Sequence, residues 1–289
     1  MSANTSNQGT NKQPIVCGTD FSACATEAAE IAAAIAHKLG TKLLIVHSQE
    51  IRGLDPKLVE LIVTEKRRDL NRAAERLRKF GTEVKEHLSS GSALDGIVDL
   101  AEESNAGLIV VGAVGHGLAR RILIGSVAER VAETSPVPTL VVRPNSQLLA
   151  WVRGERRLKI LAGHDFSPAA DAALQWVAQL RAMGDFSLMV AHTQLPNEQQ
   201  HTEQELIDRV AKIIPPQQFA ARLVPCWGNC EGALFETAAL EDVDLVVVGT
   251  HQRQGFQRIR LGSVSRAVLH HATRSVAVVP QPRERGGAP

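Results

Sequence analysis

An internal repeat is the feature that most restricts how this chain can fold. Residues 15–22 read IVCGTDFS and residues 160–167 read ILAGHDFS, so the pattern Gly-x-Asp-Phe-Ser recurs 145 positions later. Further along, LIVVG at residues 108–112 is matched by LVVVG at residues 245–249, and each copy then contains a Gly-Ser-Val tripeptide. Self-similarity of this kind indicates repeated structural units. We therefore predict two copies of one domain in tandem.

The length of the chain agrees with this division. At 289 residues it exceeds one ordinary domain, because domains typically hold about 100–200 residues. The stretch between the copies is polar around Trp151 and is interpreted as a linker. The expected division is a disordered tail at 1–12, a first domain at 13–144, a linker at 145–157, a second domain at 158–281 and a disordered tail at 282–289.

Within each copy, short β-branched runs alternate with longer stretches of helical periodicity, which is typical of βαβ units around a parallel sheet. In the first copy the predicted strands are residues 15–18, 42–47, 83–87, 108–111 and 139–142. The predicted helices are residues 24–39, 56–80, 94–103 and 127–134. The fold class is therefore α/β, with two tandem, doubly wound, open parallel sheets of five strands each, of the Rossmann-like kind.

Composition argues against two classes of partner. Lys and Arg total 32 against 31 for Asp and Glu, and aromatic residues make up 3% of the chain, which disfavours nucleic acid as a partner. No apolar run reaches the roughly 18 residues that span a bilayer, and residues 1–13 lack the apolar core of a signal peptide. The four cysteines fit a reducing compartment as thiols. We expect a cytoplasmic protein without membrane contact.

Ligands of open α/β sheets bind at the carboxyl ends of the strands, so the residues that follow the strands are the ones to inspect. Asp20 follows the first predicted strand, Ser48 follows the second, and a glycine-rich loop beginning at Gly112 follows the fourth. Glycines let the backbone approach a phosphate closely. Ser126, where the next helix starts, offers a hydroxyl and free amides to an anion. The loop lacks the Gly-Lys-Ser/Thr of a P-loop.

With these residues the chain resembles the universal stress protein family, whose ATP-binding members carry Gly, two residues, Gly, nine residues and Gly-Ser/Thr. Gly112, Gly115, Gly125 and Ser126 fit that spacing. The resemblance covers almost the whole chain, twice over. It implies a fold like that of the adenine nucleotide alpha hydrolases and ATP as the ligand, with the presence of Mg²⁺ left open.

The resemblance also implies roles for single residues. Asp20 would face the ribose and adenine, and the backbone beside Ser48 would contact adenine. The phosphates would be surrounded by Gly112, Gly115, Gly125, Ser126 and Val127. The competing interpretation is that the glycines only shape a tight loop and that Ser126 only caps a helix. Because three glycines and a serine fit together, nucleotide binding is favoured.

The second copy departs from this pattern. It keeps Asp165, Gly249, Gly262 and Ser263, but Gln252 stands where the second glycine is expected. A long side chain there would fill the space of a phosphate or change the backbone of the loop. We therefore expect a degenerate second site that binds ATP weakly or not at all. The alternative is that Arg253 and Arg260 hold a different anion.

No catalytic residue and no metal site is assigned from the sequence. His47 and His192 recur at corresponding strand ends, which indicates a shared structural hydrogen bond rather than catalysis. The favoured function is an ATP-binding stress-response regulator or switch with little or no catalysis, acting on a protein partner that the sequence does not identify. The alternatives are a nucleotide-free interaction scaffold and a true enzyme such as a nucleotidyl transferase.

The family resemblance has a further implication for assembly. Single domains of that family dimerise through their last strands. The predicted strand 139–142 would then lie beside residues 276–279, so that the two halves pair within one chain. A homodimer of whole chains stays open.

Overall fold

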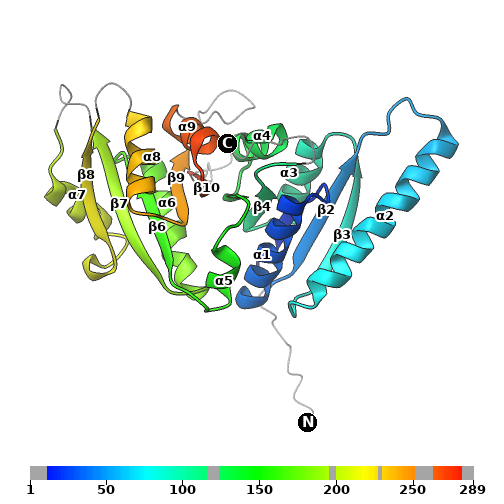
Figure 1. Ribbon diagram of the computed structural model, residues 1–289, viewed down its shortest axis with the longest axis horizontal. Coiled ribbons are helices and arrows are strands. Elements are labelled where there is room, and N and C mark those ends of the chain that lie inside the picture. The colour runs from blue at the N-terminus through cyan, green and yellow to red at the C-terminus, as the bar shows by residue number, and fades with distance from the viewer. Residues whose placement is uncertain (1–11, 116–123, 195–199, 227–229, 251–262, 282–289) are drawn as a thin grey trace, which may run out of the picture.

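The computed structural model describes residues 12–115, 124–194, 200–226, 230–250 and 263–281. Figure 1 shows two α/β halves side by side, with helices on both faces of the strands. The first half contains β1 (Ile15–Gly18), α1 (Ala23–Leu39), β2 (Leu43–Gln49), α2 (Pro56–Arg78), β3 (Val84–Ser90), α3 (Ala93–Glu103), β4 (Leu108–Gly112), α4 (Ser126–Thr134) and β5 (Thr139–Val142). The predicted α/β class and the repeat are confirmed.

The second half follows a short helix, α5 (Leu148–Val152). It contains β6 (Leu158–Gly163), α6 (Pro168–Gln179), β7 (Phe186–Gln194), α7 (Glu203–Val210), β8 (Ala220–Pro225), α8 (Cys230–Leu240), β9 (Leu245–Thr250), α9 (Ser263–His271) and β10 (Ser275–Pro280). Two 3₁₀ turns lie at Leu180–Ala182 and Pro216–Gln218. The two halves thus repeat the same order of strands.

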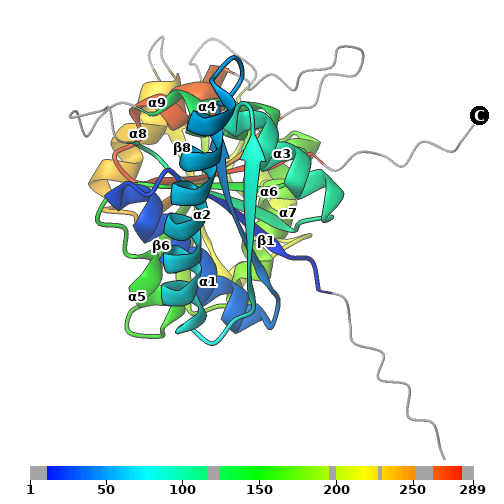
Figure 2. The same ribbon diagram turned by 90° about the vertical axis from the view of Figure 1, so that its right-hand side faces the viewer.

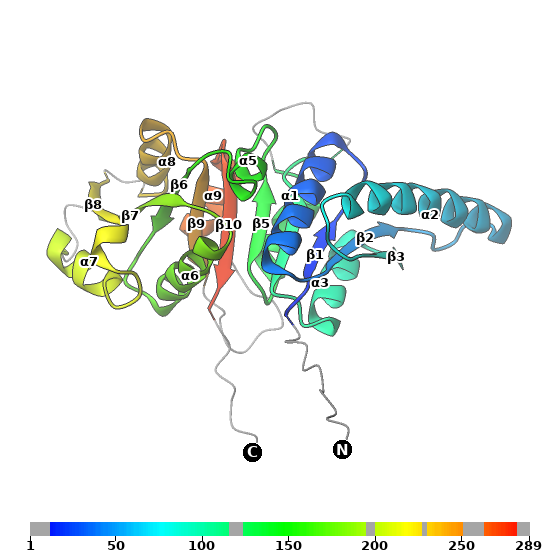
Figure 3. The ribbon, with the colours of Figure 1, turned by 90° about the horizontal axis from the view of Figure 1, so that it is seen from below.

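The strands form one ten-stranded sheet in the order β3-β2-β1-β4-β5-β10-β9-β6-β7-β8. Neighbouring strands are parallel within each half, whereas β5 and β10 are antiparallel, with Val141 opposite Val276. Figure 3 shows these two strands side by side at the centre. In the first half β1 pairs with both β2 and β4, so the winding direction changes there. This switch point is where a ligand site is expected.

Two layers of helices cover the sheet. Buried residues of α1, α2, α5, α6 and α7 share one apolar core, and those of α3, α4, α8 and α9 share the other. Helix α1 is alanine-rich and therefore packs close to the strands. An ideal Cβ on Gly112 of β4 would lie 2.9 Å from the backbone nitrogen of Ala25. Only glycine fits at that crossing of strand and helix.

The stretch expected to be a linker is packed structure. Trp151 of α5 is only 1% exposed, and its indole Nε1 donates a hydrogen bond to the carbonyl oxygen of Asp185 over 2.8 Å. Its ring fills the space beside Gly184, where an ideal Cβ would lie 2.5 Å from the Trp151 Nε1 atom. Before α5, the chain is tied to the first half, because the carboxylate of Glu27, near the start of α1, accepts hydrogen bonds from the backbone amides of Asn145 and Ser146. These contacts fix the connection to both halves.

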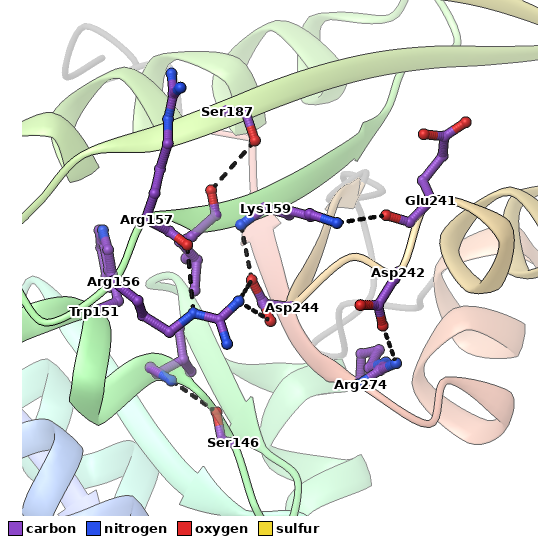
Figure 4. Close-up of polar contacts among 12 residues, drawn as sticks. Ser146, Trp151, Arg156, Arg157, Lys159, Ser187, Glu241, Asp242, Asp244 and Arg274 are labelled. Atoms are coloured by element: carbon purple, nitrogen blue, oxygen red, sulfur yellow. Dashed lines mark hydrogen bonds and ion pairs between the residues drawn. The ribbon is translucent and has the colours of Figure 1, made fainter.

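The exit from α5 is held by one carboxylate, as Figure 4 shows. Both Asp244 oxygens lie 3.0–3.1 Å from Nη2 of Arg156, and the Lys159 backbone amide donates to Asp244 over 2.9 Å. Asp244 itself is buried at the start of β9. Because a buried carboxylate needs several donors, this cluster locks the end of the connection to the second half of the sheet.

Two further observations concern membrane-spanning helices and the state of the cysteines. Among the described residues, no helix is long and apolar enough to cross a membrane. Cys17 and Cys24 are buried thiols, whereas Cys226 is disulfide-bonded, so the expectation of four thiols is wrong at that residue.

Replacing the buried indole tests whether the connection stabilises the fold. Trp151→Ala should lower the free energy of unfolding by about 3–5 kcal/mol, because it leaves a cavity and removes a partner of the Asp185 carbonyl. Guanidinium unfolding monitored by circular dichroism measures the change. Leu240→Ala is the control, since Leu240 is 83% exposed and its truncation should change stability by no more than about 0.5 kcal/mol. Equal effects of the two substitutions would refute a packed connection.

Candidate functional site

A cavity of about 330 Å³ opens at the carboxyl edge of β1, β2 and β4, beside the amino ends of α3 and α4. It lies at the switch point of the first half of the sheet. Its lining includes all seven residues that the sequence singled out in the first copy, namely Asp20, Ser48, Gly112, Gly115, Gly125, Ser126 and Val127. The structure therefore brings these residues together around one space.

The Asp-Phe-Ser turn positions Asp20 at this cavity. Phe21 has a left-handed backbone with φ of 67°, which is uncommon for a residue other than glycine and reverses the chain after β1. The Asp20 Oδ1 atom accepts a hydrogen bond from the Ser22 backbone amide over 2.9 Å. Ser22 in turn caps α1 by accepting from the amide of Ala25. One short motif thus ends the strand, starts the helix and aims the carboxylate.

Gly115 lies directly opposite that carboxylate. An ideal Cβ on Gly115 would stand 2.5 Å from Asp20 Oδ2, so any larger residue would displace the aspartate. Beyond the loop, the Gly125 amide donates to the Ala113 carbonyl oxygen over 2.7 Å, which holds the two ends of the loop together. Gly115 and Gly125 both line the cavity, and without a Cβ each leaves its own backbone accessible from it.

The amino end of α4 differs from those of α1 and α3. The serines Ser22 and Ser92 cap those two helices with their side chains, but the cap residue of α4 is Gly125, which makes no side-chain hydrogen bond. Ser126 is the first residue inside α4, so the interpretation of Ser126 as a helix cap is wrong. Among the residues that the structure describes, no side chain caps the first amides of α4, and with the helix dipole these amides suit an anion.

The opposite wall of the cavity is formed by β2 and α3. The Ser48 Oγ atom is buried and has no hydrogen-bond partner among the described residues. It faces Gly96, where an ideal Cβ would lie only 2.3 Å from that oxygen. A buried hydroxyl without a partner is costly unless something supplies one, so Ser48 marks a place for a polar group.

Part of the lining is apolar and was not identified from the sequence. Val46, Ala93, Ile97 and Val111 form an apolar wall of the cavity. Ile97 lies so close to β1 that an ideal Cβ on Gly18 would be 2.4 Å from its Cδ1 atom. The apolar face of α3 indicates that this side of the helix is buried. That it lies against the ends of the strands can be seen only in the folded structure. Such a wall suits the face of a planar ring.

The expected hydrogen bonds of the paired histidines are confirmed. The Nδ1 atom of His47 donates to the carbonyl oxygen of Thr19 over 2.8 Å, and that of His192 donates to the carbonyl oxygen of His164 over 2.7 Å. Each histidine therefore ties the end of the second strand of its domain to the end of the first. This is a structural role in both halves.

The corresponding cavity of the second half measures only about 80 Å³. Asp165 and Gly249 line it, as does Leu234, whose Cδ2 atom would lie 3.1 Å from an ideal Cβ on Gly163. Ser263 begins α9, whereas Gln252 and Gly262 lie outside the described residues. The described walls alone therefore leave much less room than those of the first half.

His164, which replaces Thr19 of the first copy, is fixed in this smaller site. Its Nδ1 atom accepts from the Phe166 amide over 3.1 Å, and its Nε2 atom donates to Asp171 over 3.3 Å. Asp171 is also paired with Arg209 from α7. Burial lowers the pKa of His164 below its ordinary value, and the contact with Asp171 offsets part of that effect. The imidazole is therefore held neutral as part of the wall.

Within the described ranges, no group of three or more histidine, cysteine or acidic side chains is placed to hold a metal ion.

Comparisons with known proteins agree with the repeat. The sequence model of the universal stress protein family matches residues 12–143 and 157–280. A universal stress protein of Mycobacterium tuberculosis is 28% identical over 212 residues, which cover 68% of this chain and 69% of that protein. One from Methanocaldococcus jannaschii is 31% identical over 137 residues, which cover 45% of this chain and 81% of the relative.

A solved structure shows the same arrangement along almost the whole chain. The crystal structure of a universal stress protein from Archaeoglobus fulgidus matches with a TM-score of 0.73 at 17% identity, covering 93% of this chain and 98% of that one. At this level of identity the likeness establishes the fold.

The buried histidine predicts a pH dependence of stability. Because the fold favours neutral His164, the unfolded chain binds more protons as the pH falls through the ordinary histidine pKa of about 6.5, and stability declines. His164→Thr, which copies the first domain, should reduce the loss of unfolding free energy between about pH 7.5 and 5.5. Urea unfolding at several pH values measures this slope. His271→Thr, at an exposed position, should leave it unchanged. An unaltered slope in His164→Thr would contradict the assignment.

Proposed function

The chain belongs to the universal stress protein family, and from this premise we propose that its first domain binds ATP in the cavity at the carboxyl edge of β1, β2 and β4. The observation that carries the proposal is the amino end of α4. It opens into a cavity of about 330 Å³ without a capping side chain, next to glycines that expose the backbone. An anionic phosphate chain is the ligand that such an end favours.

The remaining walls fit the other parts of the nucleotide. The apolar wall that includes Val46 and Ile97 suits the adenine ring, and Ser48 supplies polar atoms at its edge. Asp20 lies between this wall and the glycine loop, where a ribose with two hydroxyls would donate to its carboxylate. Gly112, Gly115, Gly125, Ser126 and Val127 would surround the phosphates. Whether Mg²⁺ accompanies them is part of the test.

We further propose that the second domain binds ATP weakly or not at all. Its described walls enclose about 80 Å³, and the neutral His164 occupies the place of the smaller Thr19. The protein would then hold one nucleotide and act as a cytoplasmic stress-response switch with little or no catalysis. A bound nucleotide shifts such a switch only by binding one conformation better than another. The nucleotide-dependent change would be recognised by a protein partner.

The first test identifies nucleotide carried by the purified full-length chain. Denaturation followed by mass spectrometry should release about one ATP per chain, because such sites are few per protein. Gly115→Gln, which copies the second loop into the first, should abolish this occupancy because its side chain collides with Asp20. Unfolding of the variant without nucleotide checks that the fold is intact. If no nucleotide is found and none binds on addition, the scaffold function replaces this proposal.

A matched pair of aspartates tests the assignment to the first domain. Asp20→Ala should weaken ATP binding about 10- to 100-fold by calorimetry, the loss expected for a hydrogen bond to a charged group. Asp165→Ala is the control, because both aspartates accept from the amide two residues later over 2.9 and 3.1 Å. The two substitutions therefore disturb the same turn. Equal loss of affinity in both variants would sink the assignment.

A further inference from the structure

A second cavity of about 320 Å³ lies between α1 and α2, at the carboxyl end of β1. Ile45 belongs to its lining, whereas the neighbouring Val46 lines the nucleotide cavity, so the two spaces lie on opposite faces of the sheet. Helix α2, which faces the viewer in Figure 2, forms its outer wall. We call this space the α2 cavity. Its volume is large enough for a small molecule.

The charges around the α2 cavity favour an anion. Its charged lining residues are Arg72, Arg76 and Asp69. Arg72 pairs with Asp69, which also lies 3.8 Å from Lys66, and Arg76 lies 3.5 Å from Glu30 of α1. Three cations therefore meet two carboxylates, which leaves one positive charge and several guanidinium N–H groups to spare. Helix α2 as a whole carries seven basic residues against four acidic ones, so its other charges add to this excess.

The second half of the chain shows what covers the matching aromatic ring. Phe166 corresponds to Phe21, since both belong to the Asp-Phe-Ser turn. The imidazole of His201 stacks on Phe166 with ring centroids 4.1 Å apart and planes 21° from parallel. Phe21 instead lines the α2 cavity, and the Nζ atom of Lys66 lies 5.7 Å from its ring centroid. Because the lysine side chain is flexible, a planar ring has room to stack on Phe21.

The second half also contains a carboxylate that the first half lacks. Thr26 lines the α2 cavity, and the residue 145 positions later is Asp171. The Nε atom of Arg209 donates to Asp171 over 3.0 Å, and the two side chains form an ion pair. Arg209 belongs to the helix after the second strand of its half, as Arg72 and Arg76 do. A carboxylate brought by a ligand would give the first half the same kind of pair.

A buried hydrogen-bond acceptor lies beside the same aromatic ring. The rings of His47 and Phe21 have centroids 4.6 Å apart, and His47 lies on the same face of β2 as Ile45, two residues before it. Since Nδ1 of His47 donates to the Thr19 carbonyl oxygen, Nε2 is the acceptor, and it is buried without a partner among the described residues. A ligand ring with a hydroxyl or an N–H would bring a donor to this side of the cavity.

We propose that the α2 cavity is a second ligand site, which takes a small aromatic carboxylic acid. The ring of the acid stacks on Phe21, and its carboxylate pairs with Arg72 and Arg76. An inorganic anion would leave the ring of Phe21 uncovered, so the aromatic acid is the better fit. The inference is independent of nucleotide binding, because the two cavities open on opposite faces of the sheet.

Calorimetric titration of the full-length chain with para-hydroxybenzoate tests the site. The dissociation constant should lie at about 10 µM to 1 mM, as expected for so small a ligand. Two analogues separate the contributions of the acid and of the ring. Para-hydroxybenzyl alcohol lacks the carboxylate and cyclohexanecarboxylate lacks the planar ring, so each should bind at least about 10-fold more weakly.

Two variants with matched controls locate the binding. Arg72→Gln combined with Arg76→Gln should weaken the binding of para-hydroxybenzoate about 10- to 100-fold, the loss expected for hydrogen bonds to a charged group. Arg67→Gln combined with Arg68→Gln removes the same charge from exposed positions of the same helix that do not line the α2 cavity, and it should leave the affinity unchanged. Thr26→Asp copies the second half and should weaken binding, because its carboxylate competes for the arginines.

Circular dichroism checks that each variant is folded, which is expected because Arg72 and Arg76 are 76% and 46% exposed. The proposal is overturned if para-hydroxybenzoate does not bind up to about 5 mM. Equal affinity for para-hydroxybenzyl alcohol or for inorganic phosphate would also overturn it. So would an equal loss of affinity in the two double arginine variants, since the effect would then be one of overall charge.

Discussion

The antiparallel ladder between β5 and β10 is the contact on which the rest of the architecture depends. Every residue of both strands is buried and most are apolar, and in separate domains the two strands would be exposed edges that invite aggregation. Their pairing turns two five-stranded sheets into one and buries both edges. Arg143, directly after β5, secures the junction through its backbone amide to Ser275 and its guanidinium to the Leu269 carbonyl oxygen, each over 3.1 Å.

Much of the fold could be predicted from the sequence because its signals are local. Strong β-branched runs and the serine caps set the bounds of β1, β5, α1 and α3 to within a residue. β3 extends to Ser90, beyond the predicted residue 87, because its last residues pair with β2 through backbone hydrogen bonds that need no apolar side chain. The connection at α5 was mistaken for a simple linker, since the partners of Trp151 lie more than 30 residues away.

The candidate site, like the fold, could be predicted in part from the sequence. The carboxyl-end rule and the glycine spacing were sufficient to select seven residues that line one cavity. The apolar wall around Ile97, the orientation of Asp20 toward Gly115 and the filling of the second site by His164 were not predictable. Each of these features depends on which elements meet in the folded sheet. The spacing of residues along the sequence carries no information about the distance between such elements in space. The first turn of α4 was located correctly, but its cap residue was not.

The packed connection at α5 has a mechanical consequence. Chains with two nucleotide-type domains often close around a ligand by bending at a flexible hinge, but here Trp151 and the Arg156–Asp244 cluster fill the place where a hinge would lie. Rotating one half against the other would also tear the central ladder. The common sheet is therefore a rigid frame, and movement within either half is left to the loops and helix ends at its rim.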